Sequence, residues 1–101
     1  MITVLASIYV NEGAMDDFLK IFKANVPTVC AEEGCVSYVP MIDVETDLPP
    51  QIQNPNIVTI VEQWEDLNAL KAHLAAPHML KYKEDVKKLV EKVSLKVLKN
   101  A

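Results

Sequence analysis

The segment from Ile2 to Val10 constrains the fold most, because neither of its faces is suited to open water. Its even-numbered positions are all apolar, and its odd-numbered positions carry Thr3, Leu5, Ser7 and Tyr9 rather than charged residues. A two-residue period is typical of a β-strand, in which successive side chains point to opposite faces. We therefore expect a strand that needs cover on both sides.

Three further segments show the same alternation, and the strands expected from it are Cys35–Ile42, Ile57–Trp64 and Val93–Leu98. In the first of these, strict alternation places Val36 and Tyr38 on one face and Cys35 on the other. Pro40 has no backbone N–H to donate, which predicts an edge strand or a bulge at that position. Residues 43–56 are polar and rich in proline, so we expect a long loop there, of a length that is often functional.

Between the strands the apolar residues recur with helical spacing. A stripe of this kind predicts a helix over residues 14–29, in which Pro27 is expected to end the helix early or to bend it. Asp66 is a suitable N-cap for a helix over residues 67–76. Pro77 then suits the first turn of another helix, whose apolar stripe continues to Val93.

The resulting order is β-α-β-β-α-β, which predicts one domain over residues 1–101. The fold class is α+β: a ferredoxin-like arrangement of a four-stranded antiparallel sheet with helices on one face. The helices leave the other sheet face bare although its strands are apolar there too. Burial is worth about 25 cal/mol per Å² of apolar surface. We therefore expect a homodimer formed through the sheet face.

Composition argues against several classes of function. All ten basic residues are lysine, and with a net charge of -4 the chain has no basic cluster for nucleic acid. Two glycines are too few for a dinucleotide or phosphate-binding loop. No apolar run approaches the roughly 20 residues that cross a bilayer, and the start of the chain does not resemble a leader, so we expect a cytoplasmic protein without membrane contact. Cys30 and Cys35 are expected to be reduced thiols without a catalytic role.

Three groups of residues carry a resemblance to a known family: Glu33-Gly34-Cys35-x-x-Tyr38, Glu62-Gln63-Trp64, and Ala69-Leu70-x-x-His73 followed by Pro77-His78. In this order and spacing, over nearly the whole chain, they resemble the antibiotic biosynthesis monooxygenase family of dimeric α+β barrel proteins. The resemblance implies one of several activities, because that family includes cofactor-independent oxygenases of quinols and phenols, haem-degrading enzymes, an autoinducer-processing isomerase and members without known activity.

Departures from two branches narrow this choice. Haem-degrading members have an asparagine, a tryptophan and an iron-binding histidine where this chain has Ala6, His73 and Lys83. The isomerase branch has a histidine late in the first helix, where this chain has Val26. The resemblance therefore favours the oxygenases.

His73 and His78 are the candidate catalytic residues, since histidine is the side chain that ordinarily titrates near neutrality and is a suitable base for a phenolic proton. Each histidine could instead have only a structural role in its helix. They lie five positions apart in the sequence, with Pro77 between them and no carboxylate clearly joining them, so we expect no metal site.

Four more residues are candidates for substrate binding. Trp64 could form a flat wall against an aromatic ring, and Tyr38 and Tyr82 could bond a substrate oxygen, although core packing is the default explanation for all three. Glu62 shares a strand face with Trp64, which predicts a buried carboxyl with a raised pKa or, alternatively, an ion pair with a lysine of a partner subunit.

The function expected from these observations is that of a cofactor-independent monooxygenase. Its substrates would be dioxygen and a quinol, phenolic or similar enolisable aromatic molecule. Two alternatives stay open: a dimer without enzymatic activity that binds a small ligand or acts as a scaffold, and an isomerase or hydrolase of a small dicarbonyl compound.

Overall fold

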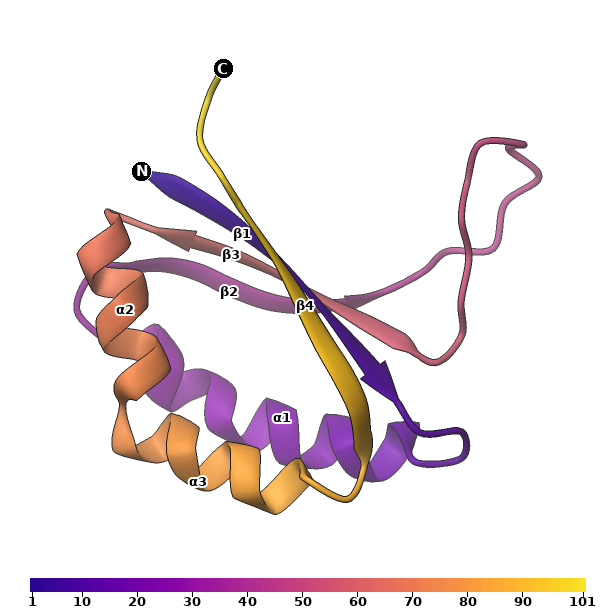
Figure 1. Ribbon diagram of the computed structural model, residues 1–101, viewed down its shortest axis with the longest axis horizontal. Coiled ribbons are helices and arrows are strands. Elements are labelled where there is room, and N and C mark those ends of the chain that lie inside the picture. Colours follow the sequence, from indigo (N-terminus) through magenta and orange to yellow (C-terminus); the bar gives the residue numbers. More distant parts are fainter.

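The computed structural model describes residues 1–101, and its elements follow the expected order. They are β1 (Ile2–Val10), α1 (Met15–Cys30), β2 (Cys35–Ile42), β3 (Ile57–Trp64), α2 (Leu67–Ala75), α3 (Pro77–Val86) and β4 (Val90–Leu98). The strands form one antiparallel sheet in the order β2-β3-β1-β4, and the three helices lie together on one face of it (Figure 1). The predicted α+β, ferredoxin-like fold is confirmed.

The core lies between the helices and the sheet face formed by the even-numbered residues of β1. Val4 and Ile8 of that strand are buried, and so are Phe18 and Phe22 of α1, whose rings stack with their centroids 5.8 Å apart. In β3 the even-numbered residues face the same way, because Ile60 pairs with Ala6 across the sheet. The helices therefore pack mainly against these two central strands.

The side-chain orientation predicted for the start of β2 is wrong. Cys35 pairs with Trp64, but Ser37 pairs with Gln63, so one extra residue, Val36, is inserted in β2. A bulge of this kind reverses the alternation from that point. Cys35 consequently lies on the same sheet face as Tyr38, whereas Val36 is exposed. Pro40 lies on an edge strand, which is one of the two alternatives expected for it, the other being a bulge.

Two helix boundaries also differ from expectation. Helix α1 continues through Pro27 to Cys30, and the fully buried Val29 anchors its last turn to the core. A proline costs a helix one internal hydrogen bond, and here it does not end the helix. Helix α3 ends at Val86, and β4 begins at Val90, which pairs with Val10. The apolar spacing beyond Val86 therefore belongs to a turn and a strand.

Two parts of the sheet are uncovered in the single chain. One is the helix-side face of β4, where Val93 and Leu95 are 56% and 48% exposed. The other is the face opposite the helices, hereafter the outer face, which carries Leu5, Val61 and Val39 side by side. Residues 43–56 form the expected loop, which extends away from the helices (Figure 1). All three helices are too short or too polar to traverse a bilayer.

Candidate active site

A cavity of about 470 Å³ lies between the helix-side face of the sheet and helices α2 and α3. Twelve of its sixteen lining residues are hydrophobic. Four of the six predicted site residues line it, namely Tyr38, Glu62, His73 and Tyr82. Its volume and its apolar lining with a few polar groups are typical of pockets that bind small organic molecules.

Glu62 brings a carboxyl group to the floor of this cavity. It lies on β3 opposite Val4 and Tyr38, and the indole Nε1–H of Trp64 donates a hydrogen bond to its Oε1 at 3.0 Å. Burial raises the pKa of the Glu62 carboxyl to about 7, although the bond from Trp64 acts in the opposite direction and the charge of Glu32 raises it further. At neutral pH the carboxyl group is therefore able to donate or to accept a proton.

Trp64 lies behind the cavity wall and does not line the cavity. Its side chain is fully buried, and its ring packs against that of His73 with the centroids 4.6 Å apart. Trp64 thus contacts both His73 and Glu62. It therefore supports two side chains that do line the cavity.

His73 reaches the cavity from α2 and is only 1% exposed. Its Nδ1 lies 2.8 Å from Oε2 of Glu32. Because an ionised carboxylate only accepts hydrogen bonds, this contact assigns the proton of a neutral His73 to Nδ1. Nε2 has no partner within the protein, yet no buried side-chain nitrogen or oxygen is left without one, so Nε2 borders open space. We assign that space to the cavity.

Burial lowers the pKa of His73, and the hydrogen bond and charge of Glu32 oppose this effect. The imidazole is therefore neutral at neutral pH, with a bare nitrogen available to take a proton. An imidazole held by a carboxylate on its far nitrogen is the arrangement of the histidine and aspartate in serine hydrolases. The site resembles that arrangement only in this geometry.

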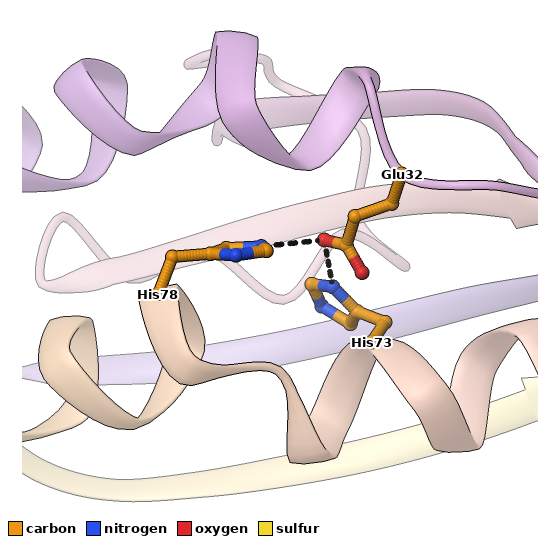
Figure 2. A group of neighbouring side chains, drawn as sticks. All are labelled: Glu32, His73 and His78. Carbon is orange, nitrogen blue, oxygen red and sulfur yellow. Dashed lines mark hydrogen bonds and ion pairs between the residues drawn. The ribbon is translucent and has the colours of Figure 1, made fainter.

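His78 lies on the first turn of α3 and does not line the cavity. Its Nε2 is 2.9 Å from the same Oε2 of Glu32, so both imidazoles approach one oxygen (Figure 2). The other side of His78 borders a separate, more open depression between α1 and α3, which Lys20 and Asp85 also line. The two histidines therefore share a carboxylate and not a cavity.

The expectation that no carboxylate joins the histidines is wrong, and Glu32 is the residue that sequence reasoning missed. It lies in the turn between α1 and β2, 41 residues before His73. Its position directly before the Glu33-Gly34-Cys35 motif was the only available signal. Spacing along the chain carries no information about a contact of this range.

The same three side chains are the one group whose donor atoms converge closely enough to consider a metal ion. The Oε2, Nδ1 and Nε2 atoms lie within 4.8 Å of one another. The hydrogen bonds of 2.8 and 2.9 Å to Glu32 account for this convergence without an ion. The absence of a metal site stays a prediction.

The hydroxyl groups of Tyr38 and Tyr82 make no hydrogen bond within the protein, although both residues are largely buried. Burial raises the pKa of both phenols, so both stay protonated donors at neutral pH. Cys30 and Cys35 are free thiols, and burial raises the pKa of Cys35 to about 11. The tyrosines can bond a substrate oxygen, whereas the thiol of Cys35 stays neutral and is a poor nucleophile.

Comparison with known proteins identifies relatives of this chain. A family profile described as antibiotic biosynthesis monooxygenase matches residues 1–85. The protein named probable quinol monooxygenase YgiN, from Escherichia coli K12, is 39% identical over an alignment of 104 positions that spans 97% of this chain and 96% of YgiN.

Solved structures share the fold at lower sequence identity. A conserved protein from Methanosarcina mazei superposes with a TM-score of 0.84 at 22% identity, covering 99% of this chain and 92% of that chain. PA3566 from Pseudomonas aeruginosa superposes with a TM-score of 0.82 at 24% identity, covering 99% and 93%. A structure described as an antibiotic biosynthesis monooxygenase gives 0.83 at 20% identity, covering 100% and 99%. These likenesses establish the fold.

Proposed function

Because the chain belongs to the antibiotic biosynthesis monooxygenase family, we propose that it is a monooxygenase that oxidises a quinol, or a similar electron-rich phenol, with dioxygen. The cavity supports this proposal through its apolar lining and its few polar groups. A flat aromatic ring suits such a lining, while the hydroxyls of Tyr38 and Tyr82 and the carboxyl of Glu62 are available to its oxygens. The name of the relative YgiN supports the same substrate class.

The observation that carries the proposal is the state of His73. Its Nδ1 is held by Glu32, its Nε2 has no partner within the protein, and the residue lines the cavity, to which we assign the space beside Nε2. A quinol must lose a proton before it readily gives an electron to dioxygen, and a positioned imidazole is a suitable base for that step. We assign His73 as the base, Glu32 as the group that stabilises its charged form, and Glu62 as the partner of the second substrate oxygen.

The reaction balances with dioxygen as the only oxidant and the quinol as the only reductant. His73 Nε2 takes the hydroxyl proton, and the quinolate passes one electron to dioxygen, which gives a semiquinone and superoxide. These two radicals join through a new C–O bond to a ring carbon. The imidazolium returns its proton to the distal oxygen, the O–O bond breaks, and loss of the ring C–H proton with hydroxide gives a hydroxylated quinone and one water.

Here the protein supplies orientation, exclusion of water and one proton acceptor. The substrate supplies the electrons, so the proposal includes no bound cofactor. Positioned proton transfer of this kind contributes about 10²- to 10⁴-fold to the rate. His78 has no direct part in this scheme because it does not line the cavity.

Oxygen consumption by the purified protein with a panel of benzoquinols and naphthoquinols tests the proposal. We expect uptake above the uncatalysed rate, a label from ¹⁸O₂ in the quinone product, and a kcat that is lower by at least about 10²-fold in His73→Gln. Lys81→Gln is the matched control, since this residue is exposed and its ion pair with Asp85 lies outside the cavity.

Three results would contradict the monooxygenase. Absence of uptake would favour a binding protein without enzymatic activity. Turnover of a small dicarbonyl compound without oxygen would favour an isomerase. Hydrogen peroxide formed with an unlabelled quinone would show an oxidase that transfers no oxygen to the ring.

We further propose that the working unit is a homodimer joined through the outer face. Leu5, Val61 and Val39 lie next to one another there, and the helices of the same chain cannot reach them. Covering this face with a second copy removes apolar surface from water, and this burial stabilises the dimer by about 25 cal/mol per Å².

The two free thiols support a reducing, cytoplasmic compartment.

A further inference from the structure

Both imidazoles of the site contact one oxygen of Glu32, and this shared oxygen has a consequence for His73. The dashed lines in Figure 2 both end on Oε2, at 2.8 Å from Nδ1 of His73 and 2.9 Å from Nε2 of His78. An ionised carboxylate oxygen accepts from two donors, so each imidazole is a donor here. His78 thus holds the same atom that fixes the proton of His73.

Glu32 depends on these contacts for its position. It lies outside the regular elements, in the turn between α1 and β2, and its side chain is 14% exposed. The two donors instead come from helices: His73 from the last turn of α2 and His78 from the first turn of α3. Without His78 the carboxylate keeps one bond and gains freedom to turn its oxygens away from His73.

From this geometry, which rests on the function proposed above, we propose that His78 is a positioning residue for the reaction. By donating its Nε2–H to Oε2 of Glu32, it holds the carboxylate against Nδ1 of His73 and thereby keeps Nε2 of His73 bare. The tautomer of an imidazole is set by the hydrogen bond that its other nitrogen makes. A histidine whose proton moves to the cavity side cannot accept the substrate proton.

The alternative that His78 only stabilises the fold makes a different prediction. If His78 only stabilised the fold, any substitution that destabilises α3 would remove its contribution. Such a substitution would change substrate binding and turnover together. The positioning role requires only an N–H donor at this place. Glutamine supplies such a donor at a similar distance from the main chain, whereas leucine fills a similar volume without one.

The experiment therefore compares His78→Leu with His78→Gln in the full chain. We expect the leucine variant to lower kcat by about tenfold or more with KM unchanged, and the glutamine variant to recover most of that loss. Nitrogen-15 NMR of the His73 imidazole is the second measurement. It is expected to show the proton on Nδ1 in the wild type and in His78→Gln, and a mixture of tautomers in His78→Leu.

The proposal is overturned if His78→Leu keeps the wild-type kcat, if both variants lose activity equally, or if the His73 tautomer is the same in all three proteins. Loss of wild-type activity on chelation, restored by Zn²⁺ or Fe²⁺, would also overturn it, because the three side chains would then bind a metal. A wild type that does not oxidise quinols refutes the proposed function instead. The tautomer measurement still decides the role of His78 in that case.

Discussion

At the scale of single residues, the state of Glu62 links the stability of the fold to the chemistry of the cavity. Its carboxyl has a pKa of about 7 in the folded chain, against an ordinary value of 4.5, chiefly because it is buried. The folded chain therefore holds a proton that the unfolded chain releases between these values. The resulting stabilisation is complete below pH 4.5 and is lost as the pH rises through 7.

Replacing Glu62 by glutamine is expected to remove this pH dependence. The shift corresponds to a loss on the order of 3 kcal/mol in the wild type between pH 4.5 and pH 8. The amide has nearly the same shape, keeps an acceptor for Trp64 and does not ionise. Urea unfolding of both proteins at the two pH values measures the difference.

His73 titrates in both of these proteins, so its contribution cancels from the comparison. Its lowered pKa acts in the opposite direction, since the stabilisation is present above the ordinary histidine pKa of 6.5 and is lost as the pH falls. Parallel pH profiles of the two proteins would show that Glu62 is ionised in the folded chain well below pH 7.

The residues that sequence reasoning found in the cavity are those that stand on an apolar face of a regular element. Tyr38, Glu62, His73 and Tyr82 occupy such positions, where a titratable side chain stands out among apolar neighbours. Glu32 lies in a turn next to another glutamate, where a solvated carboxylate is the ordinary case. Its role depends on contacts with α2 and α3, which no local pattern encodes.

At the scale of elements, the turn between α1 and β2 is pressed against α2. Gly34 has a φ of +82°, and a Cβ built on it would lie 2.6 Å from the Cβ of Ala69. Gly13 has nearly the same φ, +83°, and would place a Cβ in open space. The two glycines therefore separate the cost of the backbone conformation from the cost of the clash.

Gly34→Ala and Gly13→Ala are expected to differ in stability. Both lose about 1 kcal/mol from the left-handed backbone. Gly34→Ala loses a further 1 to 3 kcal/mol, roughly, because α2 has to move. Urea unfolding measures both. Equal losses would show that the turn and α2 separate at little cost, and Glu32, two residues before Gly34, would then be less firmly placed than we infer.

The boundaries of β1, β2 and β3 agree with the alternation of apolar residues, because a two-residue period is unambiguous over eight or nine positions. The bulge at Val36 escaped prediction, since an inserted residue leaves the composition of the segment unchanged. The predicted start of β4, Val93, lies after the observed start at Val90 for a similar reason. Leu89 and Val90 fit the helical spacing of α3 although they belong to the following turn and strand.

At the scale of the whole molecule, the proposed dimer depends on the outer face. Val61 lies on the central strand β3, between Leu5 of β1 and Val39 of β2. Val61→Lys places a charge in the middle of the proposed contact, so we expect it to dissociate the dimer into folded single chains. Sedimentation velocity at micromolar concentration measures the change.

Leu80→Lys is the matched control, because Leu80 is an apolar residue that is 57% exposed on α3, on the helix side of the sheet. It is expected to leave the mass of the particle unchanged. A wild-type protein that sediments as a single chain would refute the dimer, and a dimer that survives Val61→Lys would place the contact on another surface.

The uncovered side of β4 extends the apolar lining of the proposed site. Val93 and Leu95 belong both to the cavity lining and to the exposed surface of the strand. The apolar lining of the cavity therefore continues onto the exposed surface of β4, without a polar rim at those two positions. A ring that carries one long hydrocarbon tail can lie inside while its tail follows the strand outward, whereas a bulky, compact molecule of the same mass has to fit within the chamber. For the proposed site we therefore expect selectivity at this entrance to depend on the shape of a ligand more than on its size.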